Sequence, residues 1–194
     1  MGMRTVRWPR RRAIAVAAAA LLLATLTGCA PSPTSRPTPT PTPHPTPIFS
    51  SDKEALAAAT KAYAAYLKVS DEIAHDGGAR PERIKDFVTP EQYASQTKDF
   101  ESFRAKGYFA DGSTTFDSAR LQHRSTGRSS AVEIGIYVCL DVSAVRLTNS
   151  SGDNVTPTGR PERLPLEVVL VTAQRDANRL LVDESKLWSG KNFC

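Results

Sequence analysis

The chain has 194 residues, 25 of them Lys or Arg and 20 Asp or Glu, with a formal net charge of +5. The apolar fraction of 40 % is too high for a wholly disordered protein, and the charge is too small for a dedicated nucleic-acid binder. The first 28 residues hold five arginines and no acid, so residues 29–194 are electrically neutral. The positive charge therefore implies neither a nucleic acid nor an acidic partner.

Residues 1–28 have the organisation of an export signal. Basic residues precede an apolar run from Ala13 to Leu26, and small residues follow it. The run is shorter than the roughly 20 residues that span a bilayer comfortably. We therefore predict a signal peptide over residues 1–28, with an uncleaved anchor helix as the alternative.

The signal ends in Leu26-Thr27-Gly28-Cys29. This tetrapeptide resembles the bacterial lipobox, an aliphatic residue and two small ones before a cysteine. The resemblance implies that the sulfur of Cys29 receives a diacylglycerol, that the chain is cut before Cys29, and that the new N-terminus is acylated with a fatty acid such as palmitate. Two or more acyl chains hold a protein stably at a membrane. We expect an extracytoplasmic protein that is attached to the cell membrane by lipid.

Residues 29–50 join Cys29 to the rest of the chain through a Thr/Pro-rich segment. Eight of the 17 residues from Pro31 to Pro47 are proline. Such a sequence lacks both apolar side chains and backbone donors, so it cannot fold. An extended polyproline II stalk at about 3.1 Å per residue would reach roughly 60 Å.

Residues 51–194 are long enough for one domain with its own core. Ser51 and Glu54 form a capping box that predicts the start of a helix, and Gly77-Gly78 predicts its end. A short helix is expected from Pro81 to Val88. A third begins after the cap Thr89 and stops near Gly107.

The periodicity then changes from helical spacing to alternation. The predicted strands are Thr115–Arg124, Ala131–Leu140, Val142–Thr148, Leu164–Ala173 and Leu180–Trp188. Helices followed by four or five strands with short connections predict an α+β domain. In it, N-terminal helices pack on a curved, mostly antiparallel sheet.

This order of elements over residues 51–194 resembles the NTF2-like (SnoaL-like) cone fold. More narrowly, the segments 137–143 and 187–194 resemble small bacterial lipoproteins of unknown function. The resemblance implies a fold that hosts isomerases, hydrolases, ligand binders and assembly modules, so it does not choose among them.

Two cysteines remain in the domain, Cys139 and Cys194. An even pair in an exported domain predicts a disulfide, here between the strongest strand and the C-terminus. A redox-active pair is the alternative, but the close Cys-x-x-Cys spacing typical of such pairs is absent.

No sequence motif for catalysis, a cofactor or a metal is recognisable, so we expect no cofactor and no metal site. One enzymatic alternative uses Asp117 or His123 as a general base and Tyr137 as a donor to an oxyanion, as the cone-fold isomerases suggest. It requires Asp117 and His123 to point into one apolar cavity. An exposed, solvated strand face is the simpler expectation.

Aromatic side chains offer a second candidate site. Tyr63, Tyr66, Phe100 and Trp188 could line a small apolar pocket, although such a set more often forms core. The leading expectation for function is a non-catalytic module that binds an envelope protein or a small apolar ligand. The alternative is a cone-fold isomerase or hydrolase acting on a small organic substrate.

Overall fold

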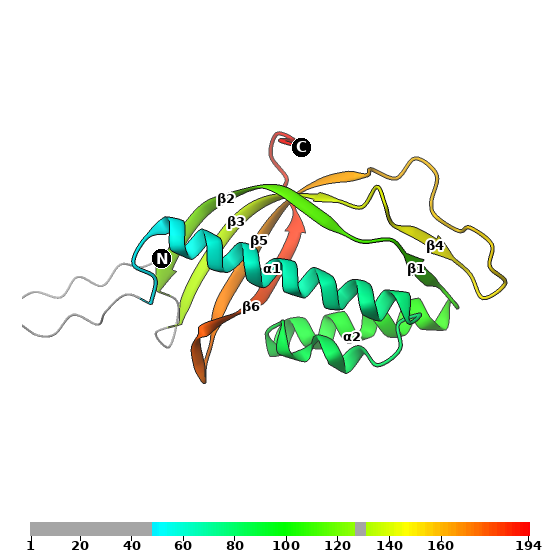
Figure 1. Ribbon diagram of the computed structural model, residues 1–194, viewed down its shortest axis with the longest axis horizontal. Helices are drawn as coiled ribbons and strands as arrows, with labels where there is room; N and C mark the ends of the chain where they lie inside the picture. The colour runs from blue at the N-terminus through cyan, green and yellow to red at the C-terminus, as the bar shows by residue number, and fades with distance from the viewer. Residues whose placement is uncertain (1–47, 127–130) are drawn as a thin grey trace, which may run out of the picture. The chain divides into compact units, whose positions relative to one another are not determined.

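The computed structural model describes residues 48–126 and 131–194. The predicted signal peptide, Cys29 and nearly all of the Thr/Pro stalk lie outside these residues. Within the described part, no helix is long and apolar enough to cross a membrane. The elements in chain order are α1 (Asp52–His75), the 3-10 helix η1 (Pro81–Asp86), α2 (Pro90–Ala105), β1 (Phe109–Asp111), β2 (Thr115–Thr126), β3 (Val132–Asp141), β4 (Arg146–Thr148), β5 (Arg163–Ala173) and β6 (Asp176–Leu187) (Figure 1).

The predicted helix ends are confirmed by their hydrogen bonds. The hydroxyl of Ser51 accepts from the backbone N–H of Glu54 at 3.2 Å. At the other end of α1, Gly77 and Gly78 have φ of +66° and +77°, a conformation that a Cβ atom would strain. The N–H of Gly78 reaches back to the carbonyl of Ile73 at 2.8 Å and closes the helix.

The main sheet has four antiparallel strands in the order β2-β3-β5-β6, with α1 lying across one face (Figure 1). The α+β class is therefore confirmed. β3 lies at the centre of the buried layer because Ile134 and Ile136 are fully buried and pair with buried residues of β5. Apolar and polar residues alternate only weakly along β2, because its register with β3 shifts twice and each shift interrupts the alternation. The shifts lie between Asp117 and Arg120 and between Leu121 and His123.

One predicted strand was wrong in extent and in place. Of the segment 142–148, only Arg146–Thr148 is a strand, and it pairs with β1 in a separate two-stranded sheet near the end of α1 (Figure 1). The chain turns before it, because Val145 donates to the carbonyl of Val142 and the carboxylate of Asp141 caps the N–H of Ser143. β1 was missed because three residues are too few to show a periodicity.

The space between α1 and the sheet is filled by side chains from both. Tyr63 is 1 % exposed at the middle of this layer and packs edge-on against Phe116 of β2 at 5.1 Å between ring centroids. The largest fully buried side chains are Tyr63, Ile73, Ile84, Ile134, Ile136 and Leu170. Side chains of α1 and the sheet therefore form the core of the domain.

Burial predicts a pH dependence of stability in the alkaline range. Desolvation raises the pKa of Tyr63 from 10.0 to about 12, against the opposing effect of a hydrogen bond with Ser185. Between these values the unfolded phenol is ionised and the folded one is neutral, so the free energy of unfolding falls as the pH rises from 10 to 12. We expect a fall on the order of 2 kcal/mol, measured by denaturation at several pH values.

The control for this effect is Tyr63→Phe, which keeps the ring and removes the ionisable group. Its stability should fall less steeply over the same range; the remaining slope is assigned to Tyr66, whose pKa burial also raises. An equal slope in the two proteins would contradict the assignment to Tyr63.

Candidate functional site

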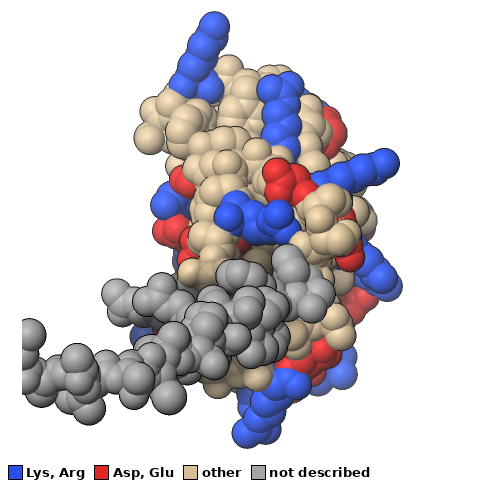
Figure 2. Space-filling view, turned by 90° about the vertical axis from the view of Figure 1, so that its left-hand side faces the viewer, with Lys and Arg blue, Asp and Glu red and all other residues tan. Residues whose placement is uncertain are grey.

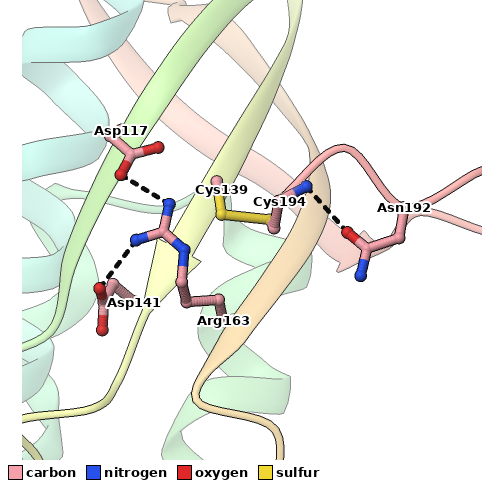
Figure 3. Close-up of a disulfide and its surroundings, with 6 residues drawn as sticks. All are labelled: Asp117, Cys139, Asp141, Arg163, Asn192 and Cys194. Atoms are coloured by element: carbon pink, nitrogen blue, oxygen red, sulfur yellow. Dashed lines mark hydrogen bonds and ion pairs between the residues drawn. A yellow bond between two sulfur atoms is a disulfide. The ribbon is translucent and has the colours of Figure 1, made fainter.

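The face of the sheet opposite α1, here called the outer face, carries Asp117, one of the three candidate catalytic residues. Arg163 of β5 donates to Asp117 at 2.7 Å and to Asp141 at 2.9 Å, so one guanidinium holds two carboxylates (Figure 3). The hydrogen bond from Arg163 is the main cause that lowers the pKa of Asp117. Asp117 is thus an ionised, half-exposed partner of an arginine, and its proton affinity is too low for an effective general base at neutral pH.

His123 lies further along β2 and is held in a different set of contacts. Its Nε2 lies 2.9 Å from Glu133 and its Nδ1 3.2 Å from the side-chain oxygen of Gln122. The imidazole lies against the backbone of Gly135, where a Cβ atom would overlap it. The side chain of His123 is 39 % exposed. Asp117 and His123 therefore do not point into one apolar cavity, which the enzymatic alternative requires.

Tyr137, the third catalytic candidate, anchors the C-terminal tail. Its hydroxyl accepts from Gln122 at 2.6 Å, and its ring packs edge-on against Trp188 and Phe193 at 4.9 and 5.9 Å between ring centroids. The predicted disulfide is present: Cys139 of β3 is joined to Cys194 across 5.4 Å between Cα atoms (Figure 3). The tail after β6 is thus fixed to the outer face by a covalent bond and an aromatic cluster.

The four aromatic residues proposed to line a pocket are not brought together. Tyr63 and Tyr66 stack at 5.8 Å inside the core, and Phe100 packs against that core from α2. Trp188 packs on Tyr137, on the other face of the sheet. The sheet separates it from Tyr63, so this set forms core and tail contacts and no pocket.

An apolar depression of about 360 Å³ lies beside α1. We call it the α1–hairpin groove, because α1 forms one wall and the β5–β6 hairpin another. Its lining residues are Ala58, Lys61, Ala62, Ala65, Asp86, Phe87, Asn178, Arg179 and Leu180. The alanines follow one another on one side of α1 at helical spacing, and their short side chains leave the hollow. Phe87 and Leu180 complete the apolar floor.

Three charged side chains also line the groove. Arg179 forms an ion pair with Asp86 at 3.5 Å, with side chains 49 % and 79 % exposed. Lys61 is exposed on α1 and makes no ion pair with any residue that the structure describes. On the face of the molecule in Figure 2, acidic and basic side chains are interspersed with uncharged surface. The rim therefore carries two cations and one anion.

A second depression of about 250 Å³ lies where the chain enters α1, and its arginine, Arg124, is already engaged. Arg124 donates to the carbonyl of Phe49 at 2.7 Å and pairs with Asp52 at 3.1 Å. Its guanidinium thus fastens the segment before α1 to β2. Because Arg124 is used to hold this segment, we take the α1–hairpin groove as the better candidate for binding of the two depressions.

Chemically, the groove suits a ligand with an apolar part on its floor, and its residues offer no catalytic group. None of the residues lining it stands as a paired nucleophile and base. Among residues 48–126 and 131–194, no three potential metal ligands cluster. The spacing of Ala58, Ala62 and Ala65 was visible in the sequence, but Phe87 and Leu180 join them only through the fold.

Neither a protein-family model nor a curated protein sequence matches the chain. Among solved structures, the intermembrane space region of the chloroplast protein ARC6 matches with a TM-score of 0.51 and 9 % identity, covering 70 % of this chain and 97 % of that one. A periplasmic fragment of TraM matches with a TM-score of 0.46, 10 % identity and coverage of 71 % and 96 %. ActVI-ORFA from Streptomyces coelicolor matches with a TM-score of 0.38 and 17 % identity, covering 68 % of this chain and 93 % of that one.

At 9 % identity, the match to the ARC6 region concerns the fold alone. The matches to TraM and ActVI-ORFA have lower TM-scores. The domain has helices packed on one face of a curved, four-stranded antiparallel sheet, as the order of elements in the sequence predicts. This domain shares its fold with the ARC6 region.

Proposed function

We propose that this protein is a lipid-anchored extracytoplasmic binding module, non-catalytic, presented at the cell membrane on a Thr/Pro stalk. The anchor rests on the signal-like segment 1–28 and the lipobox-like residues before Cys29. The disulfide between Cys139 and Cys194 supports an oxidising compartment outside the cytoplasm. On this proposal the Thr/Pro-rich sequence that follows Cys29 lets the domain reach partners or ligands in the envelope.

The observation that carries the binding role is the α1–hairpin groove. Side chains fill the core between α1 and the sheet. On the outer face, Asp117 is paired with Arg163 and Glu133 with His123. The groove by contrast keeps a hollow with an apolar floor open to solvent. Apolar hollows with a few polar groups at the edge are the usual form of ligand sites.

Filling the groove should abolish this binding. Ala62→Phe places a large ring over the floor from a half-buried position of α1, and we expect loss of most of the fluorescence that the uncharged apolar dye Nile red gains on the wild-type domain. The measurement is a fluorescence titration on residues 44–194, which hold the entire core and the disulfide.

The matched control is Ala94→Phe, the same substitution at an exposed position of α2 outside the groove. It should bind Nile red as the wild type does. Equal dye binding by Ala62→Phe, with its native circular dichroism spectrum intact, would contradict the assignment of the groove.

The cone-fold isomerase or hydrolase keeps one supporting feature, the His123–Glu133 pair on the outer face. Because that pair is partly exposed and faces no apolar hollow, we rank this alternative second. A substrate turned over by the wild type and not by His123→Gln would favour it.

A further inference from the structure

We infer that the α1–hairpin groove takes a single-chain anionic amphiphile, whose carboxylate lies at the rim between Lys61 and Arg179. This inference rests on the proposed function of the groove and adds the chemical class of its ligand. Three observations carry it: the size of the hollow, the chemistry of its floor, and the charges on its rim.

Size limits the occupant to one small molecule. A volume of about 360 Å³ is near the lower end of small-molecule sites and leaves room for one acyl chain. A stable protein partner would need roughly 800 Å² of this surface, far more than a groove with nine lining residues offers.

The floor of the groove favours an apolar tail. Ala58, Ala62 and Ala65 present methyl groups in a row along α1, and Phe87 and Leu180 face them. None of these five side chains can form a hydrogen bond, so a polar tail would lose its water without compensation. An alkyl chain has no hydrogen bonds to water to lose, and burying its apolar surface in the groove is favourable.

The rim selects the sign of the head group. Lys61 stands on α1 and Arg179 at the start of β6, both exposed and both lining the groove. Asp86 partly neutralises Arg179 at 3.5 Å, so the rim keeps a net charge of one positive unit. A carboxylate would gain charge–charge attraction from both cations, whereas an uncharged hydroxyl head could only accept a hydrogen bond from them.

The inference is tested with decanoate and decanol, which share one chain and differ in the charge of the head. Calorimetric titration of residues 44–194 at pH 7 should give an affinity for decanoate about fivefold above that for decanol. Raising the salt concentration should remove this advantage, because exposed charges are screened.

Three variants locate the effect. Lys61→Gln and Arg179→Gln should each weaken decanoate binding about threefold and leave decanol unchanged. Asp86→Asn removes the competing carboxylate and should strengthen decanoate binding about twofold, a gain that misfolding cannot mimic. Lys68→Gln, on α1 but outside the groove, is the control and should change neither affinity.

The outcomes separate the ligand class from the site. Equal affinity for decanoate and decanol in the wild type, both lost in Ala62→Phe, would overturn the anionic head and keep the groove. Binding of decanoate that survives Ala62→Phe would overturn the site itself, and with it the proposed function.

Discussion

Cys194→Ala is expected to lower the free energy of unfolding by about 4 kcal/mol. The bond between Cys139 and Cys194 closes a loop with a sequence separation of 55, and this cross-link restricts the unfolded chain. The substitution is made at the exposed cysteine, so the buried thiol of Cys139 remains as a small apolar group and packing changes little. Denaturant unfolding of residues 44–194 measures the difference.

The wild type provides its own control after reduction. Reduced wild type and Cys194→Ala should unfold at the same denaturant concentration, and reducing agent should not affect the variant. Thiol titration of denatured, unreduced wild-type protein should find no free thiol in the domain. Two free thiols, or equal stability of the oxidised wild type and the variant, would contradict a stabilising cross-link.

Cys29→Ala is expected to move the full-length protein from the membrane fraction to the soluble fraction. The lipobox-like context implies that the sulfur of Cys29 carries the diacylglycerol, and without this sulfur no acyl chain is attached. The described domain offers no helix that could replace the anchor. Cell fractionation followed by immunoblotting gives the measurement.

Cys194→Ala is the matched control for this experiment, because it also removes one cysteine but leaves the lipobox-like residues intact. It should stay in the membrane fraction. Retention of Cys29→Ala in the membrane would contradict lipidation and favour an uncleaved helix formed by the apolar run 13–26 as the anchor.

The two faces of the sheet differ in what they can do. The inner face is sealed by α1 and holds the buried side chains of β3 and β5. The outer face carries charged and polar side chains, several tied to one another: Arg163 to Asp117, and Gln122 to Tyr137 and Glu167. Ion pairs of this exposed kind contribute little to stability, and they hold the acids in their ionised form. The outer face therefore holds the C-terminal tail, through Cys139 and Tyr137, and its paired acids are poor candidates for a general base.

Local chemistry made several features predictable from the sequence. The caps at Ser51 and Thr89 depend on residues three positions away, so the helix starts were correctly predicted. The strong alternation of residues 131–140 predicted strand β3, because alternate side chains of a strand face the same side of the sheet. The pairing of Cys139 with Cys194 followed once Cys29 was assigned to lipid, because two cysteines allow one pairing.

Only the tertiary structure decided which side of the sheet each residue meets. Periodicity groups residues within one element but does not say which element covers them, so Trp188 could be grouped with Tyr63 although the sheet lies between them. The same limit applied to Asp117, whose partner Arg163 lies 46 residues away. It applied to the groove as well, since α1 and the hairpin meet only in the fold. The sequence by itself predicted the helices, most of the strands and the cross-link, because these follow from local pattern and cysteine number. Long-range packing decided which residues meet on each face of the sheet and in the α1–hairpin groove.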